Sequence, residues 1–313
     1  MNILLIKTSA LGDVVRTLIL IRALRKKFNN PNIYWYCGDG SKLIEKLDKY
    51  DKLKFIYNIS NLKNVFDITL SLEEDLDLVK NVTKFFNKKS LFYGFYYCEI
   101  NHVIKYTPNT AAWNDMGLQS RFGINIANKL KKNNKLSFYE IWSSILGCNK
   151  INFEQNLFPS NLKKTYIAIC PWAGERWAAK SMTDKDLLAL INGLISYGID
   201  NIILLGFPPK NSKYVKLFSK FYIDTTKDYK KLFNYLSSSK VVITADSLCL
   251  HLATLFNIDT ISFYTVTSAY EIDVTKNSEK IINTSKHYCS YNKKISKCNI
   301  SVDKILSKIY KYL

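Results

Sequence analysis

The chain has 313 residues, of which 47% are hydrophobic, and its formal net charge is +19 at pH 7. This composition excludes an intrinsically disordered protein, and no segment approaches the roughly 20 consecutive apolar residues of a membrane-spanning helix. The length predicts two domains of about 150 residues each. Because Lys7 interrupts the first apolar run after a few residues, we expect no secretory signal and predict a cytoplasmic protein.

Short apolar segments alternate with amphipathic ones along the first half of the chain. Strands are predicted at 3–6, 33–36, 53–57, 66–70 and 91–97, and helices at 14–28, 41–47 and over most of 113–146. Strands interleaved with helices are typical of a parallel sheet. The first half is therefore expected to be an α/β domain.

The pattern lapses into polar residues between 152 and 164, and a second series of elements follows. Strands are predicted at 166–170, 202–205, 241–244 and 260–264, and helices at 184–197, 229–237, 247–256 and 301–310. We therefore expect two Rossmann-like βα domains, residues 1–158 and residues 159–313, the second closed by the C-terminal helix. Such domains are expected to face one another across a cleft, with the carboxyl edges of both sheets toward the ligand.

The seven cysteines are odd in number and show no C-x-x-C spacing. This usage is typical of reduced thiols in the cytoplasm and not of a disulfide framework. His287, Cys289 and Cys298 form the one grouping that could hold a metal ion, but their irregular spacing is a weak zinc signal. An ordinary surface turn before the last helix is the alternative, and we predict no metal or cofactor.

The positive charge indicates an anionic partner, which could be a nucleic acid, a phosphorylated small molecule or an anionic membrane surface. A genome whose codons favour Lys, Asn, Ile and Tyr would give the same composition without such a partner. The basic residues occur in short scattered clusters such as 25–27, 131–132 and 230–231. This distribution does not favour the basic stripe of a nucleic-acid-binding protein.

The segment "KTSALGDVVRT", residues 7–17, connects the first predicted strand to the first predicted helix. Thr8, Ser9 and Gly12 belong to this loop at the carboxyl edge of the sheet. Asp13 has two interpretations: it could be the N-cap of the helix, with Gly12 easing the turn, or a general base beside an acceptor hydroxyl. The spacing of these residues does not decide between them.

Two further segments follow strands in the second half of the chain. In "VVITADSLCLHLATLF", residues 241–256, an apolar strand runs into Asp246 and Ser247 and then into an apolar helix that is expected to begin at Ser247. The unpaired N–H groups at the start of that helix could bind phosphate, although both residue types are also common N-caps. His251, one turn into the helix, is either a packing residue or a ligand contact.

The other segment is "CPWAGERWAAKSM", residues 170–182, in which Ala173 and Gly174 would let a ligand approach the backbone. Arg176 and Lys180 could neutralise a diphosphate as it becomes a leaving group. Ordinary solvent exposure of these two basic side chains is the alternative.

Taken together, these segments resemble glycosyltransferase family 9, the family of the ADP-heptose:lipopolysaccharide heptosyltransferases. The stretch "ILLIKTSALGDVVRT" is similar to that family's opening motif, "AGERWAAKSM" to its A-G-x-R-W-x-x-K-x-W loop, and "VVITADSLCLHLA" to its D-[ST]-x-x-x-H element. The stretches "TVTSAYEI" and "CSYNKKISKCNISVDKIL" are also similar to the family. The similarity covers nearly the whole chain in the family's order.

The resemblance implies a GT-B fold with inverting, metal-independent transfer, a sugar nucleotide bound by the C-terminal domain and an acceptor bound by the N-terminal domain. It places Asp13 at the family's proposed general base and Lys180 at the lysine that contacts the donor phosphates. The donor-binding element falls on Asp246, Ser247, Leu248 and His251.

ADP-heptose is the donor that the resemblance favours, and the expected acceptor is a lipopolysaccharide core or another surface glycan. We also expect peripheral contact with an anionic membrane, at the inner face of the cytoplasmic membrane, and no nucleic acid.

The chain departs from the family pattern at Met182, which replaces an aromatic residue, at Leu248, which replaces a glycine, and at Thr265, where members usually show Gly-Pro-Thr. The segment after residue 206 also lacks the acidic residue that holds a ribose in the heptosyltransferases. These departures motivate an alternative, a protein that binds sugar nucleotide without turnover. A nucleic-acid-binding protein is the other alternative that the charge leaves open.

Overall fold

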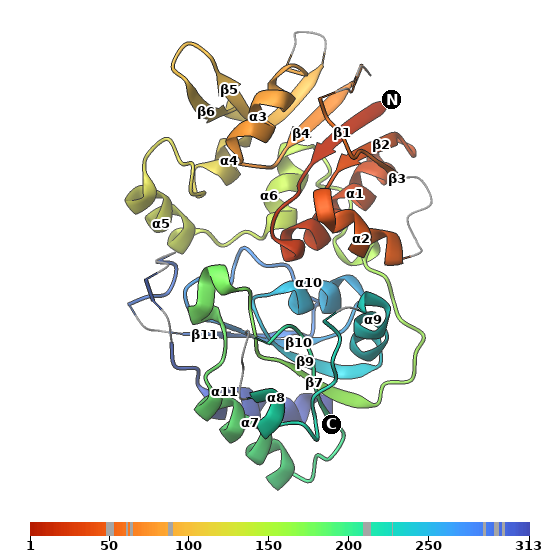
Figure 1. The fold of residues 1–313 in the computed structure, drawn as a ribbon, viewed down its shortest axis with the longest axis vertical. Coiled ribbons are helices and arrows are strands. Elements are labelled where there is room, and N and C mark those ends of the chain that lie inside the picture. The colour runs from red at the N-terminus through yellow and green to blue at the C-terminus, as the bar shows by residue number, and fades with distance from the viewer. Residues whose placement is uncertain are drawn as a thin grey trace. The chain divides into compact units, whose positions relative to one another are not determined.

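The computed structural model describes residues 1–47, 53–60, 62, 65–86, 90–208, 214–226, 228–283, 286–290, 294–295 and 298–313. The chain divides into two compact units, Met1–Asn156 and Leu157–Leu313, called here the N-terminal and C-terminal units (Figure 1). This division falls two residues before the expected boundary. Among the described residues, no helix combines the length and the apolar character needed to cross a bilayer.

The N-terminal unit is built on a sheet whose described strands run in the order β3-β2-β1-β4-β5-β6. All neighbours are parallel except the antiparallel pair β5 and β6. The strands are β1 (Asn2–Ile6), β2 (Asn32–Tyr36), β3 (Leu53–Phe55), β4 (Ile68–Ser71), β5 (Leu91–Cys98) and β6 (Val103–Tyr106). The helices are α1 (Leu11–Lys27), α2 (Ser41–Ile44), α3 (Leu76–Thr83), α4 (Ala111–Asn114), α5 (Ile124–Asn133) and α6 (Phe138–Ile145).

Strand β1 lies in the centre of this sheet because its apolar run has neighbours on both faces. Leu4 and Ile6 pack in a cluster with Val82 of α3 and with Phe85, which follows that helix. Ile3, which alternates with them, faces the other side of the sheet and is also fully buried. A strand buried on both faces reads as a continuous apolar run, as the sequence does here.

The C-terminal unit has a parallel sheet whose described strands run in the order β11-β10-β9-β7-β8. The strands are β7 (Tyr166–Cys170), β8 (Ile202–Leu204), β9 (Ser239–Ala245), β10 (Thr260–Tyr264) and β11 (Glu279–Ile282). The helices are α7 (Asp184–Ser196), α8 (Tyr214–Leu217), α9 (Tyr229–Ser237), α10 (Leu248–Leu255) and α11 (Val302–Ile309).

Helices cover both faces of the C-terminal sheet. Helices α7 and α11 pack on one face, where Leu190 and Ile305 join a cluster with Ile169, Ile243 and Phe263 of the strands. Helices α9 and α10 lie on the opposite face (Figure 1). Both units are therefore Rossmann-like α/β layers, as the sequence predicts.

The strand order reverses once in each unit. In the N-terminal unit the chain adds β2 and β3 on one side of β1, then crosses to β4 and β5 on the other side. In the C-terminal unit β8 lies on one side of β7, and β9, β10 and β11 lie on the other. Ligands of open α/β sheets bind beyond the carboxyl ends of the strands at such a reversal. Ligands are therefore expected at the loops after β1 and β4 in the N-terminal unit and at those after β7 and β9 in the C-terminal unit.

Candidate functional site

The loop after β1 is tightly wound, and helix α1 begins earlier than the sequence predicts. Ala10 has a φ of 56°, a region that disfavours residues with a side chain, and it occupies the N-cap position without a side-chain cap. Asp13 is consequently the third residue of α1, next to Gly12. The interpretation of Asp13 as an N-cap is therefore wrong.

The carboxylate of Asp13 lies between two basic side chains. Arg16 Nη2 is 3.0 Å from Oδ1, and Lys7 Nζ is 4.0 Å from Oδ2. The Asp13 side chain is 31% exposed, so solvent or a substrate can reach it. These contacts orient the carboxylate at the carboxyl edge of the sheet.

Arg16 is itself held by aromatic rings. Its guanidinium lies 4.5 Å from the centroid of Phe138 and 5.3 Å from that of Trp113, distances at which cation–π attraction operates. The two rings contact each other edge to face. The rings restrict the position of the guanidinium, and this restriction stabilises its ion pair with Asp13.

A buried carboxylate that the sequence analysis missed, Glu73, organises the same loop. It follows β4 and accepts a hydrogen bond from Lys7 Nζ at 2.6 Å. It also accepts from the backbone N–H and the hydroxyl of both Thr8 and Ser9. The hydroxyl groups of Thr8 and Ser9, predicted to line the acceptor loop, therefore donate to Glu73.

The environment of Glu73 has two opposing effects on its acidity. Burial alone would raise the pKa of the carboxyl group, but Lys7 and the hydrogen bonds from Thr8 and Ser9 outweigh it and hold the pKa below its ordinary value. Glu73 therefore stays ionised at neutral pH, and Lys7 compensates its charge. The pair joins β1 to β4 at the point where the strand order reverses.

In the C-terminal unit, Lys180 and Asp246 form the corresponding pair. Lys180 follows β7 and donates to the Asp246 carboxylate at 2.7 Å and, at 3.3 Å, to the Asp246 carbonyl oxygen. Asp246 follows β9 and is buried. This pair again spans the two strands between which the order reverses.

Two further groups contact the Asp246 carboxylate. Thr267 donates its hydroxyl to Oδ2 at 2.7 Å, and His251 Nε2 lies 3.9 Å from Oδ1. Burial would raise the pKa of Asp246, but Lys180 and His251, with the hydrogen bonds from Lys180 and Thr267, hold it well below its ordinary value. Asp246, Lys180 and His251, predicted separately from the sequence, are brought together.

Ser247 occupies the N-cap position of α10, and the helix begins at Leu248, one residue later than expected. The side chain of Ser247 makes no capping hydrogen bond, and among the described residues its buried hydroxyl oxygen has no hydrogen-bond partner. The first N–H groups of any α-helix lack partners within the helix. The start of α10 therefore presents hydrogen-bond donors beside the Lys180–Asp246 ion pair, whose charges compensate each other.

The loop after β7 lies against the same network. Gly174 has open space where a Cβ atom would project, and Ala173 donates its N–H to the hydroxyl of Ser181 at 2.9 Å. Thr265 donates its hydroxyl to the carbonyl oxygen of Ala179 at 2.7 Å. The side chain of Arg176, another predicted donor contact, lies outside the described part of the chain.

Met182, where the family pattern has an aromatic residue, is buried in the core with α7 and the sheet. The substitution at this position therefore changes the packing of the core. It does not remove a polar group from the Asp246 network.

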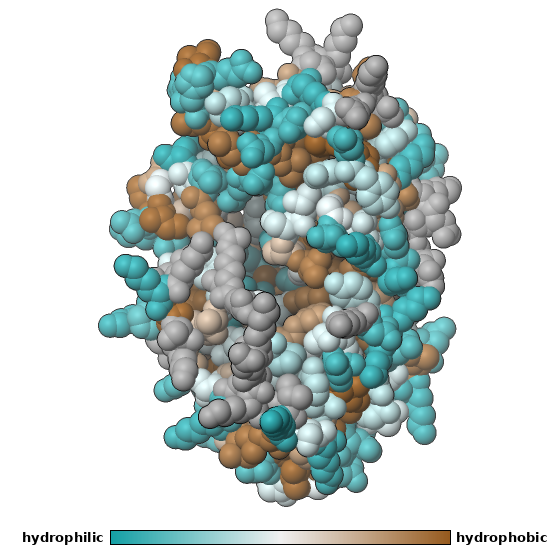
Figure 2. Space-filling model, in the orientation of Figure 1, coloured by the Kyte–Doolittle hydropathy of each residue, from teal (hydrophilic) through white to brown (hydrophobic). Residues whose placement is uncertain are grey.

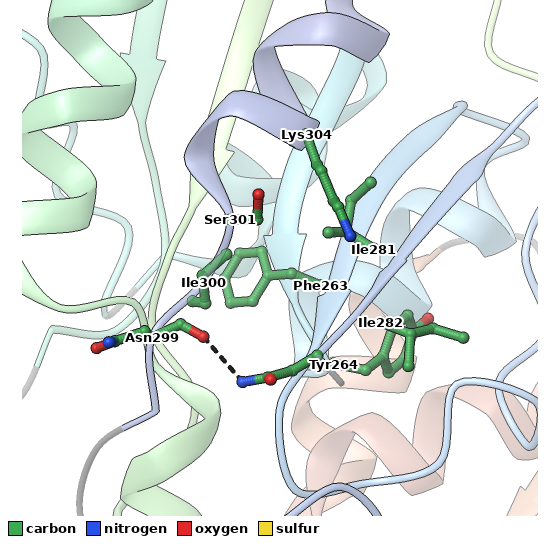
Figure 3. A pocket seen from close by; sticks show the side chains of 9 residues that line it. Phe263, Tyr264, Ile281, Ile282, Asn299, Ile300, Ser301 and Lys304 are labelled. Carbon is green, nitrogen blue, oxygen red and sulfur yellow. Dashed lines mark hydrogen bonds between the residues drawn. The ribbon is translucent and has the colours of Figure 1, made fainter. Parts of the chain in front are cut away.

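A cavity of about 270 Å³ opens at the carboxyl ends of β10 and β11 in the same unit. Phe263, Ile281 and Ile300 form its apolar walls, and Lys304 of α11 reaches over Ile281 (Figure 3). Because these strands are parallel to β9, the cavity lies at the same edge of the sheet as Asp246. The sequence analysis did not identify it.

His287, Cys289 and Cys298, the weak candidate for a metal site, are not grouped as metal ligands. Among the residues that the structure describes, no three His, Cys, Asp or Glu side chains are grouped as metal ligands. Cys289 and Cys298 are buried, and Cys298 packs against Ala179 and Val266. The turn expected in the alternative is present at 286–289, but Cys289 and Cys298 are buried and do not lie at the surface.

Two of the residues missed from the sequence, Glu73 and Thr267, bind partners that are distant along the chain. Arg16 pairs with Asp13, three residues before it, but the rings that hold it are distant. Glu73, Arg16 and Thr267 each act through contacts with another loop or helix. A signal did exist for Glu73, because the acidic run "EED" directly follows an apolar strand at the edge where ligands bind.

Comparisons with known proteins show the fold and the family of this chain. The fold is that of GT-B enzymes, since two E. coli structures match almost the whole chain. Heptosyltransferase WaaC with ADP has a TM-score of 0.58 at 14% identity, covering 99% of this chain and 97% of its own. ADP-heptose lps heptosyltransferase II has a TM-score of 0.62 at 14% identity, covering 100% and 98%.

A glycosyltransferase family 9 structure from Veillonella parvula DSM 2008 has a TM-score of 0.63 at 12% identity, covering 99% of this chain and 96% of its own. No curated protein sequence gives a significant match. The model of glycosyltransferase family 9 (heptosyltransferase) matches residues 119–301, more than half of the chain. The protein belongs to glycosyltransferase family 9 and is a glycosyltransferase.

Replacing Glu73 by Gln keeps the shape of the side chain but removes the charge that compensates Lys7. We expect Glu73→Gln to lower the free energy of unfolding at pH 7 by about 3 kcal/mol, because it leaves one partner of a buried pair uncompensated. Urea denaturation of the full chain measures the change. Glu99→Gln, at an exposed turn of the same unit, is the control and should have no effect.

The same comparison has a defined pH dependence. The pKa of Glu73 is lowered on folding, so its stabilisation is complete above the unfolded-state pKa of about 4.3 and is lost as the pH falls through the folded-state value. The difference between wild type and Glu73→Gln should be constant from about pH 5.5 to 8 and shrink below about pH 4. A difference that grows on acidification would contradict this account.

Because Lys180 and Asp246 form an ion pair, we expect substitutions of the two residues to have non-additive effects on the free energy of unfolding. Lys180→Met and Asp246→Asn should each destabilise the C-terminal unit by about 3–5 kcal/mol, because each leaves a buried partner uncompensated. The double variant should be less destabilised than the sum by at least about 1.5 kcal/mol. A double-mutant cycle in urea measures the coupling free energy between the two residues. Strictly additive effects would show that Lys180 and Asp246 do not stabilise one another.

Proposed function

We propose that the protein is an inverting enzyme that transfers a sugar, with ADP-heptose as the favoured donor, to a lipopolysaccharide-core or other surface-glycan acceptor. The observation that carries the proposal is the set of donors around Asp246 at the strand-order reversal of the C-terminal sheet. E. coli WaaC structures with ADP and with ADP-2-deoxy-2-fluoro heptose have the same fold. They support a sugar nucleotide as the ligand of this edge.

In the proposed donor site, Asp246 positions the binding groups and does not itself contact the diphosphate. Its carboxylate would repel a phosphate if it were not neutralised by Lys180. The Lys180 ammonium has three hydrogens, and two are accounted for by its bonds to Asp246, so a third can reach a phosphate oxygen.

The hydroxyl of Ser247 and the first N–H groups of α10 would complete the contacts with the diphosphate. The positive end of the α10 dipole favours negative charge at this point. The open space at Gly174 supports close approach of the ligand to the backbone. Leu248, at the first position of α10, would contribute its backbone N–H, a role that does not depend on the glycine that the family pattern has there.

The proposed acceptor site is beside Asp13. The acceptor hydroxyl would attack the anomeric carbon as Asp13 takes its proton, while the bond from that carbon to the diphosphate oxygen breaks and the nucleoside diphosphate leaves with the electron pair. A single displacement of this kind inverts the anomeric configuration. Glu73 would act as a positioning residue, because it holds the loop that leads into the helix carrying Asp13.

Binding without turnover is a weaker proposal on these observations. The departures at Met182 and Thr265 leave the contacts among Lys180, Asp246 and Thr267 in place, and Asp13 is accessible. Family membership also favours the glycosyltransferase over a nucleic-acid-binding protein.

The role of Asp13 is tested by Asp13→Asn, which keeps the size of the side chain but cannot accept the proton. We expect kcat for transfer from ADP-heptose to fall by at least about 10³, within the range known for general bases, and donor affinity to change less than about threefold. Coupled ADP release measures transfer, and isothermal titration with ADP measures donor binding. Asp39→Asn, an exposed aspartate of the same unit, should keep both.

Two results would contradict the assignment. Wild-type turnover in Asp13→Asn would remove Asp13 as the base. Loss of ADP binding in Asp13→Asn, with turnover reduced only in proportion, would move Asp13 to the donor site.

A further inference from the structure

Helix α5 and its flanking loops carry an unusual number of exposed apolar side chains. All ten residues of α5 are described, and only Ala127 is buried. We define the α5 surface by six apolar side chains that are between 38% and 51% exposed: Leu118, Phe122, Ile124, Ile126, Leu130 and Leu136. Figure 2 shows apolar side chains gathered over the region of α5, with hydrophilic ones beside them.

The charge of this segment has one sign. Between residues 116 and 139 the sequence has no Asp or Glu, and it has five basic residues: Arg121, Lys129, Lys131, Lys132 and Lys135. Arg121 pairs with Asp115 at 3.0 Å. Lys129 and Lys132 are exposed on α5 itself.

The apolar and basic side chains are interleaved along the helix. Ile126 and Leu130 are four residues apart and therefore lie on one stripe of its surface. Lysine side chains can extend along an apolar surface while their ammonium groups stay in water. A short helix with an exposed apolar stripe and a basic border is typical of segments that lie in the headgroup region of a membrane.

A single kind of occupant fits both properties. A nucleic acid would use the lysines but leave the exposed isoleucine and leucine side chains in water. A second copy of this chain, paired about a two-fold axis, would bring the same positive charges together. We propose that the α5 surface docks the N-terminal unit on an anionic lipid bilayer.

This inference deepens the proposed function. It rests on that function in one respect, which is that a glycolipid acceptor would lie in a membrane. Docking is measured without donor or acceptor. The lipid surface and the transfer reaction can therefore fail independently.

The experiment is co-sedimentation of the full chain with vesicles of phosphatidylcholine alone or with 30% phosphatidylglycerol, at about 50 and 300 mM salt, chosen to span a wide range of Debye screening. We expect binding to the anionic vesicles only, weakened by salt. Lys129→Gln with Lys132→Gln should weaken binding about 30-fold, which corresponds to about 1 kcal/mol for each lysine. Ile126→Ser with Leu130→Ser should weaken it at least about tenfold, because apolar burial is lost.

Matched controls come from the C-terminal unit. Leu188→Ser with Ile195→Ser removes two apolar side chains of similar exposure from α7, and Lys185→Gln with Lys304→Gln removes two exposed lysines. Both should bind vesicles like the wild type. Unchanged thermal melting of the α5 variants confirms that they fold, and turnover on a water-soluble acceptor reports separately on the transfer reaction.

Four outcomes would overturn the docking proposal. These are equal binding to neutral and anionic vesicles, equal loss in the α7 controls, loss with the lysine pair but not with the apolar pair, and absence of vesicle binding by the wild type. A dimer in light scattering that the Ile126→Ser, Leu130→Ser variant dissociates would instead assign the surface to a second copy of the chain.

Discussion

A buried carboxylate that must be compensated fixes the functional edge of each sheet. Transfer of a charge from water to the protein interior costs several kcal/mol unless a partner and hydrogen bonds offset it. Glu73 and Asp246 are both buried, and each meets a lysine, Lys7 at 2.6 Å and Lys180 at 2.7 Å. Each pair links the two strands between which the strand order reverses. Ligands of such sheets bind at this reversal, so the pairs stabilise the loops of the expected ligand site.

The two units use this common device differently. In the N-terminal unit, Glu73 accepts hydrogen bonds from the hydroxyl groups of Thr8 and Ser9. The strained turn at Ala10 leads into helix α1, on which Asp13 lies beside Arg16. In the C-terminal unit, the Asp246 carboxylate accepts hydrogen bonds from Lys180 and Thr267, while the hydroxyl of Ser247 makes no capping hydrogen bond at the start of α10. One edge thus presents an accessible carboxylate and the other presents hydrogen-bond donors, the two kinds of group that the proposed glycosyl transfer requires.

The strong local patterns were predictable, and the contacts between distant loops were not. The strands at 166–170 and 260–264 and the helix at 229–237 appear with the predicted bounds, because their periodicity is clear and their ends are marked by polar residues. Helices α3 and α8 and strands β6 and β11 were not predicted. Length alone does not explain these omissions, because α3 has eight residues, whereas strands β3 and β8, with three residues each, lie within predicted strands. The structure brings together Lys180, Asp246 and His251, which the sequence analysis had named separately. Nothing local indicated that Lys180 would bind Asp246, because the two partners are 66 residues apart. The same separation hid Glu73 from Lys7.

The central claim, that the nucleotide is held at the carboxyl edge of the C-terminal sheet around Asp246, is tested most directly by hydrogen exchange followed by mass spectrometry with and without ADP. The account predicts slower exchange in peptides covering residues 172–182 and 246–252, and unchanged exchange in those covering residues 7–17, because ADP lacks the acceptor that Asp13 would meet. Protection confined to residues 7–17, or found in neither unit at saturating ADP, would contradict it.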